Sequence, residues 1–160
     1  MTTPDMLLVR YRDAGLRIAT AESCTAGLLA ARITEVAGSS TIFDRGVVTY
    51  TNRSKQDLLG VAAETLDAHG AVSEPVAREM AEGMLARSEA DVAAAITGIA
   101  GPGGSDAKPE GRVCFAIALR EGDTRTETQE FGPLGRKNVR RAAVDHAMSL
   151  LDAAVGEPSP

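Results

Sequence analysis

The chain has 160 residues, of which 44% are hydrophobic and 24% are charged, and its formal net charge is −5. These values are typical of a single soluble domain, and the acidic balance argues against a broad basic surface for nucleic acid. Two cysteines, Cys24 and Cys114, lie far apart in the sequence, which argues against a disulfide framework or a structural zinc site and favours a reducing compartment.

The predicted elements alternate between strands and helices along most of the chain. The hydrophobic pattern predicts a helix at 4–14, a strand at 16–21, a helix at 25–36, a strand at 43–50 and a short helix at 54–59. A helix capped by Ser73 follows at 73–88, then strands at 92–97 and 113–119, a hairpin turn at Gly122-Asp123, a strand at 124–131 and a helix at 135–154.

This order predicts the α/β class, with a mixed and mainly parallel sheet of about five strands covered by helices on both faces. We expect one domain over residues 1–155 and a disordered tail at 156–160. No apolar run is long enough for a membrane span or for the core of a signal peptide, so we expect a cytoplasmic protein without a membrane partner.

The first candidate for chemistry is Ser23, in the turn between the first predicted strand and the next helix. A hydroxyl near the start of a helix faces unpaired N–H groups and a field that stabilises negative charge. Such a place suits a nucleophile whose substrate develops an oxyanion. The alternative is that Ser23 or Thr25 only caps the helix.

A nucleophilic serine needs a base, and Lys55 is the better candidate than either histidine. Lys55 follows the second strand and enters a short helix, so its amine can turn back over the strand end. We expect His69, in a loop, and His146, in the last helix, to be surface or packing residues. To act as a base, Lys55 needs a pKa about three units below the usual value of about 10.4, through burial and a neighbouring cation. The alternative for Lys55 is a solvated residue on the helix surface. Tyr50 is a candidate proton relay or oxyanion donor, and the alternative for it is ordinary packing at the end of a strand.

Two further segments indicate anion binding at the same edge of the sheet. Residues 97–104 form a glycine-rich loop after a buried strand, which matches neither the Walker pattern nor the dinucleotide fingerprint. Cations at the start of the last helix oppose its dipole, so Arg136 or Arg140 is a candidate for holding a phosphate or a carboxylate. A flexible turn and a solvated charged face are the alternatives.

The chain resembles the CinA C-terminal domain family over residues 7–151. The resemblance rests on TAESCTAG at 20–27, GVVTY at 46–50 with Lys55, GAVS at 70–73 and TGIAGPGG at 97–104. Members of that family often have Gly-Gly where this chain has Ala26-Gly27.

The resemblance implies a three-layer α/β/α fold and the activity of the family's enzymes, which are nicotinamide-mononucleotide deamidases working without metal or cofactor. It implies that Ser23 is the nucleophile and Lys55 its base, with Tyr50 beside them. It implies substrate-binding positions at Tyr50, Thr97 and Gly98, and Arg136 as the arginine for the nucleotide phosphate. Further candidates for substrate binding, from their places in the turn, the glycine-rich loop and the last helix, are Thr25, Gly101 and Arg140. We expect a small nucleotide as substrate and a homo-oligomer, dimeric or larger.

Two other functions fit the same residues. One is a non-catalytic nucleotide-binding or regulatory module that uses the same pocket. The other is a hydrolase acting on a different amide or ester. Release of ammonia from nicotinamide mononucleotide distinguishes the three.

Overall fold

The fold is built around one sheet, whose five strands lie in the order β2-β1-β3-β4-β5. The computed structural model describes residues 1–105 and 107–156. Its strands are β1 (Ile18–Glu22), β2 (Phe43–Val48), β3 (Val92–Gly98), β4 (Arg112–Leu119) and β5 (Arg125–Glu130). Strand β1 is parallel to β2 and β3, whereas β4 is antiparallel to β3 and β5. The predicted mixed sheet is confirmed.

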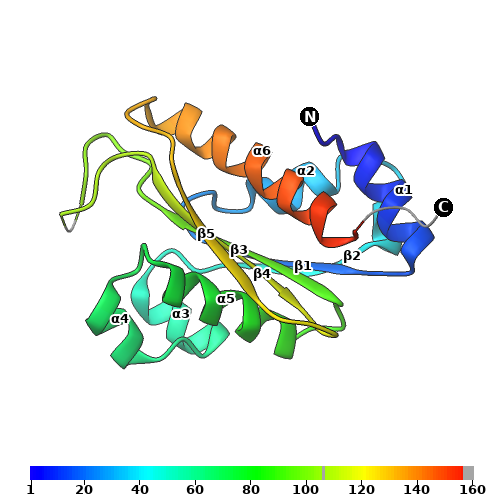
Figure 1. The fold of residues 1–160 in the computed structure, drawn as a ribbon, viewed down its shortest axis with the longest axis horizontal. Helices are drawn as coiled ribbons and strands as arrows, with labels where there is room; N and C mark the ends of the chain where they lie inside the picture. The colour runs from blue at the N-terminus through cyan, green and yellow to red at the C-terminus, as the bar shows by residue number, and fades with distance from the viewer. Residues whose placement is uncertain (106, 157–160) are drawn as a thin grey trace.

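Helices cover both faces of the sheet, as Figure 1 shows. Helices α1 (Pro4–Ala14), α2 (Leu28–Ile33) and α6 (Arg136–Ala154) lie on one face, and α3 (Asn52–Leu59), α4 (Ala63–His69) and α5 (Glu74–Ala86) lie on the other. A 3₁₀ turn at Ser39–Thr41 precedes β2. One cluster of buried apolar side chains lies on each side of the sheet. The three-layer α/β/α architecture is therefore confirmed.

The strand register brings three chain segments to one edge of the sheet. Glu22, the last residue of β1, pairs with Val48 at the end of β2 and with Ile96 in β3. Because these strands are parallel, their carboxyl ends and the loops that follow lie together. The turn at 23–27, the loop after β2 and the glycine-rich loop after β3 therefore converge.

The elements differ from the sequence prediction in two places that bear on this edge. The helix predicted at 25–36 forms only over Leu28–Ile33, because Ala26 and Gly27 have φ values of +47° and +98° and break the helical path. Helix α4 was not predicted, so His69 ends a helix and does not lie in a loop. Of the expected tail, residues 157–160 lie outside the described residues.

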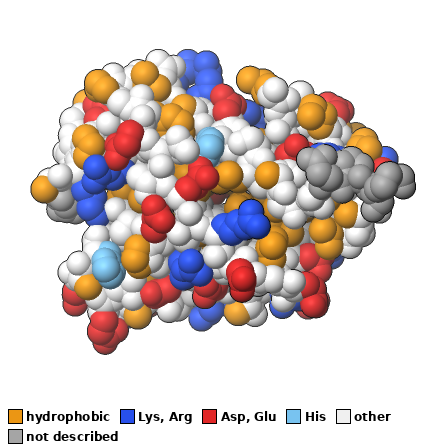
Figure 2. Space-filling model, viewed as in Figure 1, with side chains coloured by type: hydrophobic (Ala, Val, Ile, Leu, Met, Phe, Trp, Pro, Cys, Tyr) orange, Lys and Arg blue, Asp and Glu red, His pale blue; other side chains and the backbone are white. Residues whose placement is uncertain are grey.

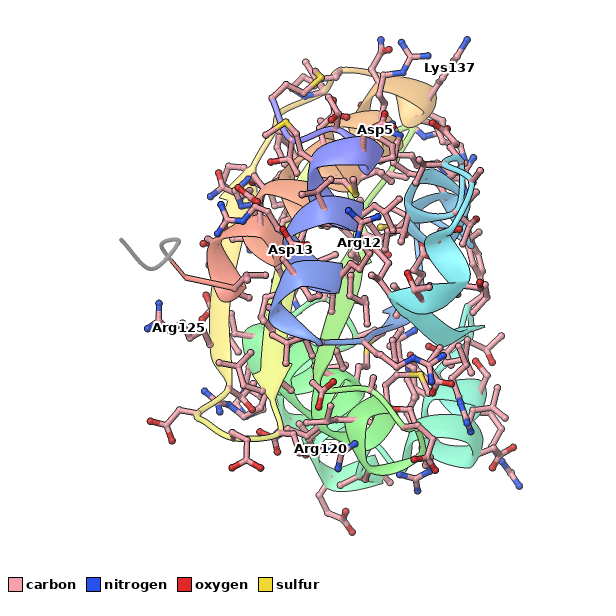
Figure 3. The ribbon with its side chains drawn as sticks, turned by 90° about the vertical axis from the view of Figure 1, so that its right-hand side faces the viewer. Asp5, Arg12, Asp13, Arg120, Arg125 and Lys137 are labelled. Atoms are coloured by element: carbon pink, nitrogen blue, oxygen red, sulfur yellow. The ribbon has the colours of Figure 1, made fainter. Side chains whose placement is uncertain are left out.

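The surface mixes charges of both signs. Figure 2 shows acidic and basic side chains interspersed over one face of the molecule. Figure 3 looks onto α1, where Asp5, Arg12 and Asp13 lie on the outer surface. Within the described residues, no helix combines the length and apolar character needed to cross a membrane.

Helix α3, which carries Lys55, packs closely against α5 at Gly83. A Cβ built on Gly83 would lie only 1.9 Å from the backbone oxygen of Leu59, the last residue of α3. Backbone cannot yield as a flexible side chain can, so any larger residue at position 83 must push the two helices apart. Gly83 thus helps to set the position of α3 over the sheet.

We expect Gly83→Ala to lower the free energy of unfolding by about 1–3 kcal/mol, because the added methyl group overpacks the α3–α5 contact. Urea unfolding measures the change. Glu82→Ala, at the exposed neighbouring position on α5, is the control and should change the value by less than about 0.5 kcal/mol. Equal stability of Gly83→Ala and the wild type would contradict the close approach.

Candidate active site

Ser23 lies in the turn directly after β1 and is 8% exposed. Its N–H donates to the backbone oxygen of Ile96 at 3.0 Å, which continues the pairing with β3 beyond the end of β1. The left-handed conformations of Ala26 and Gly27 then turn the chain sharply into α2. Ser23 is therefore fixed at the edge of the sheet by backbone bonds on a rigid strand.

A carboxylate caps α2 in place of the two hydroxyls considered from the sequence. The N-cap residue is Gly27, which offers no side chain, and Glu22 accepts hydrogen bonds from the N–H groups of Leu29 and Ala30 at 2.8 and 3.1 Å. The Thr25 hydroxyl donates to the same carboxylate at 2.6 Å. The Ser23 hydroxyl is thus free of any capping role.

The Lys55 amine meets the Ser23 hydroxyl inside the protein. Its Nζ lies 3.0 Å from Ser23 Oγ and donates to the backbone oxygen of Thr49 at 2.7 Å. The local sequence makes this possible because Thr51 starts α3 with a capping box, which places Lys55 one turn into the helix above the end of β2. Lys55 is only 1% exposed, so it is not the solvated helix residue that was the alternative from the sequence.

Burial lowers the pKa of Lys55 from 10.5 to about 8, since an ammonium loses its hydration in this position. The lowering comes from desolvation, and the neighbouring cation expected from the sequence does not contribute. With a pKa of about 8, roughly a fifth of the molecules carry a neutral amine at pH 7.4. A neutral amine at hydrogen-bonding distance from a hydroxyl is a competent general base.

Cys24, beside the nucleophile candidate, is not a competing nucleophile. Its thiol is 5% exposed, and burial raises its pKa to about 11. The thiol therefore stays protonated at neutral pH, and only the thiolate is strongly nucleophilic.

Backbone N–H groups for an oxyanion lie in the turn, whereas the sequence indicated the helix start. The N–H groups of Leu29 and Ala30 are engaged by Glu22, and that of Leu28 donates to Thr25 O. Among the described residues, no oxygen accepts a hydrogen bond from the N–H of Cys24 or Thr25. Thr25 is fully buried and does not line the pocket, so the N–H of Cys24, next to Ser23, is the available donor.

Tyr50 and Arg136 form one side of the pocket mouth. The Arg136 guanidinium donates to the Tyr50 hydroxyl and, at 2.7 Å, to the backbone oxygen of Gly101. Arg136 is the first residue of α6, so this contact joins α6 to the loops after β2 and β3. Tyr50 is 55% exposed and therefore does not pack as an ordinary strand-end residue.

The glycine-rich loop is held by two residues that sequence reasoning missed. Glu110 accepts from the N–H of Gly103 at 2.6 Å and from that of Gly135 at 3.1 Å, which ties the loop to the start of α6. Lys108 donates to the backbone oxygens of His69 and Val72 at 2.7 and 2.6 Å. A charged residue within or just after a glycine-rich loop was the available signal for both.

These segments enclose a pocket of about 320 Å³ with Ser23 and Lys55 in its wall. Other lining residues are Cys24, Tyr50, Ala71, Val72, Thr97, Gly98, residues 99–105 and Arg136. The structure thus brings together most of the residues expected from the sequence, including Gly101. Among the described residues, no three His, Cys, Asp or Glu side chains cluster as a metal ion would require.

Two residues expected to bind substrate lie outside the pocket. Thr25 is fully buried, with its hydroxyl engaged by Glu22. Arg140 donates through Nε to the backbone oxygen of Cys24 at 3.1 Å and lines a separate groove between α2 and α6. Lys137, in the same groove, extends outward from the start of α6 in Figure 3.

Neither histidine reaches the pocket. His146 contacts Glu127 and packs its ring against Phe115, with a centroid separation of 4.8 Å. His69 is exposed at the end of α4. Both residues have the surface or packing role expected from the sequence.

Comparison with known proteins places this geometry in a family. The sequence model of the CinA C-terminal domain matches residues 2–155. The chain belongs to the CinA C-terminal domain family. The resemblance read from the four motifs is therefore confirmed.

Relatives and solved structures agree with this assignment. A CinA-like protein of Mycolicibacterium gilvum is 59% identical over 143 residues, and one of Akkermansia muciniphila is 52% identical over 145. Each alignment covers 89% of this chain but only 34% and 35% of the relative, so the chain spans about a third of their length. The crystal structure of the competence/damage inducible protein CihA from Agrobacterium tumefaciens superposes with a TM-score of 0.92 at 46% identity, covering 96% of this chain and 93% of that one.

We expect Lys55→Met to raise the free energy of unfolding at pH 7 by about 1–2 kcal/mol, because the variant no longer buries an ammonium. Below pH 8 the folded wild type carries this cost. Between pH 8 and 10.5 the folded amine is neutral while the unfolded one still binds a proton, so wild-type stability rises with pH and the advantage of the variant shrinks.

Urea unfolding of both proteins across pH 6.5–10.5 measures this difference. Arg53→Met, on the exposed side of α3, is the control and should show no such convergence. A Lys55→Met variant that is less stable than the wild type, by an amount independent of pH, would contradict a charged amine buried at a cost.

Proposed function

We propose that the chain is an amidohydrolase that converts nicotinamide mononucleotide and water into nicotinate mononucleotide and ammonia. The observation that carries the proposal is the buried contact between Lys55 Nζ and Ser23 Oγ. A pocket that only binds a nucleotide has no use for an amine whose pKa is lowered by burial beside a hydroxyl. An acyl-transfer enzyme needs a nucleophile with a base beside it, and Ser23 and Lys55 provide such a pair.

In the first half of the reaction, neutral Lys55 takes the proton of the Ser23 hydroxyl while Oγ attacks the carboxamide carbon. The carbonyl oxygen becomes an oxyanion, which the N–H group of Cys24 stabilises. Each such donor is typically worth about 3 kcal/mol in the transition state. The C–N bond then breaks, Lys55 returns the proton to the leaving nitrogen, and ammonia departs from an acyl-Ser23 ester.

In the second half, Lys55 takes a proton from a water molecule, which attacks the ester carbon. The bond to Ser23 Oγ breaks and the serine recovers its proton from Lys55. The product is a carboxylate. The positive charge of the pyridinium ring withdraws electrons from the carboxamide, so this amide is easier to attack than an ordinary one.

The rest of the pocket supports a phosphate-bearing substrate. Arg136 presents a guanidinium at the mouth, and guanidinium pairs with phosphate through parallel hydrogen bonds. In the glycine-rich loop, among the described residues, no oxygen accepts from the N–H groups of Ala100, Gly101 or Gly104. Arg136 and these N–H groups would hold the nucleotide phosphate, and Tyr50 would orient the guanidinium.

We expect Ser23→Ala to lower ammonia release from nicotinamide mononucleotide by at least about a thousandfold, because the variant has no atom that can form the acyl ester. Its melting temperature should match that of the wild type. Ammonia is measured by a coupled assay, and Ser149→Ala, an exposed serine on α6, is the control that keeps the wild-type rate.

The same assay distinguishes the other functions. If Ser23→Ala releases ammonia at the wild-type rate, Ser23 is not the nucleophile. Wild-type protein that binds nicotinamide mononucleotide by calorimetry but releases no ammonia would be a binding module. If ammonia is released from free nicotinamide as fast as from nicotinamide mononucleotide, the proposed phosphate site does not contribute to catalysis.

A further inference from the structure

We propose that Glu22 is a positioning residue of this site, which holds the turn between β1 and α2 in the conformation that presents Ser23 and the N–H of Cys24 to the substrate. The inference rests on the proposed function for its chemistry. Its structural basis is the set of contacts that a single buried carboxylate makes across the turn.

The Glu22 side chain bonds to both ends of the turn. It is 1% exposed, and one carboxylate oxygen accepts from the Thr25 hydroxyl at 2.6 Å and from the N–H of Leu29 at 2.8 Å. The other oxygen accepts from the N–H of Ala30 at 3.1 Å. Ser23 and Cys24 lie between the strand residue that supplies the carboxylate and the residues that it binds.

The shape of the turn explains why the cap comes from a strand residue. An ordinary N-cap has extended backbone and a short polar side chain, whereas the residue at this position is Gly27 with a φ of +98°. Ala26 before it is also left-handed, at +47°. Gly27 has no side chain to accept from the N–H groups of Leu29 and Ala30, so Glu22 and the turn conformation depend on each other.

The charge of Glu22 is balanced by dipoles. No Lys or Arg of the described residues forms a salt bridge with it, and its three donors are a hydroxyl and two N–H groups at the positive end of α2. An acceptor with two oxygens and no hydrogen matches these three donors. A glutamine at the same place has one acceptor oxygen, and its NH₂ group would face an N–H donor.

The contacts of Glu22 also decide which N–H groups remain for the substrate. It engages the N–H groups of Leu29 and Ala30, whereas the N–H of Cys24, beside Ser23 in the pocket wall, has no acceptor among the described residues. From the other side, Arg140 donates to the backbone oxygen of Cys24 at 3.1 Å. Relaxing the turn would misplace both Ser23 Oγ and the N–H of Cys24.

The test compares Glu22→Gln with Glu79→Gln. Glu79 is a control outside the pocket, because it accepts from the N–H of Ala62, the N-cap residue of α4, at 2.8 Å and from the Thr65 hydroxyl at 2.5 Å. Glu22 does not line the pocket, so we expect Glu22→Gln to lower kcat for nicotinamide mononucleotide about 30- to 100-fold and to change KM less than threefold. Glu79→Gln should change kcat less than twofold.

A second readout makes the result independent of the proposed substrate. Phenylmethanesulfonyl fluoride labels activated serines, and intact mass gives the rate of labelling at Ser23. We expect Glu22→Gln to slow this labelling at least tenfold and to speed amide hydrogen exchange at Leu29 and Ala30. If Glu22→Gln does not fold, Thr25→Val, which removes one of the three donors, should lower kcat and labelling three- to tenfold.

The outcomes distinguish the positioning role of Glu22 from the proposed function. If the wild type is labelled at Ser23 and releases ammonia, and Glu22→Gln equals it in kcat and labelling, the positioning role is overturned and the proposed function stands. If the wild type is labelled but releases no ammonia, the proposed substrate fails, and slower labelling of Glu22→Gln still supports the positioning role. A loss confined to KM, or an equal loss in Glu79→Gln, would assign Glu22 a purely structural role and overturn the inference.

Discussion

A lysine amine buried beside a serine hydroxyl is the interaction on which the proposed chemistry of this fold depends. Removing an ammonium from water is costly, and that cost is what moves the pKa of Lys55 toward the range where an amine accepts protons. Lys55 needs no neighbouring cation for this, because burial at 1% exposure suffices. The Thr49 carbonyl binds the amine on one side and Ser23 on the other, so the amine is held still as well as desolvated. The site is therefore an element of the fold that lowers stability and, in the proposed reaction, supplies the base.

The architecture supplies each part of this interaction from a different layer. Ser23 extends a central strand, whose backbone bonds to both neighbours leave it little freedom. Lys55 arrives on α3, which α5 holds through the glycine contact at position 83. From the opposite face of the sheet, α6 contributes Arg136 to the pocket mouth and Arg140 to the turn after Ser23. The pocket thus lies where helices from both layers meet the carboxyl ends of the parallel strands.

Much of this arrangement could be predicted from the sequence, because alternating strand and helix patterns place the segments at 22–27, 50–55 and 97–104 at one edge of the sheet. The contact of Ser23 with Lys55 followed from that topology.

The parts that could not be predicted depend on tertiary contacts. Helix α4 has only Leu66 as a buried residue, and its N-cap residue, Ala62, has no capping side chain, so the segment itself has little helical signal. Arg136 and Arg140 are one turn apart and equivalent in sequence, but only the packing of α6 directs one to the pocket and the other to Cys24. Glu22 could have been suspected, since an acidic residue that ends a buried strand must find partners.

Direct titration of the Lys55 amine tests the central claim. The chain has three lysines, at positions 55, 108 and 137, so the side-chain ¹³Cε and ¹⁵Nζ signals are few, and the signal missing from Lys55→Met assigns the one of interest. Followed by NMR from pH 6 to 11 in the folded wild type, the Lys55 signal should titrate with a midpoint near 8. A midpoint near 10.4, the value of a free lysine in water, would mean that the amine beside Ser23 stays charged at neutral pH and would contradict its role as the base.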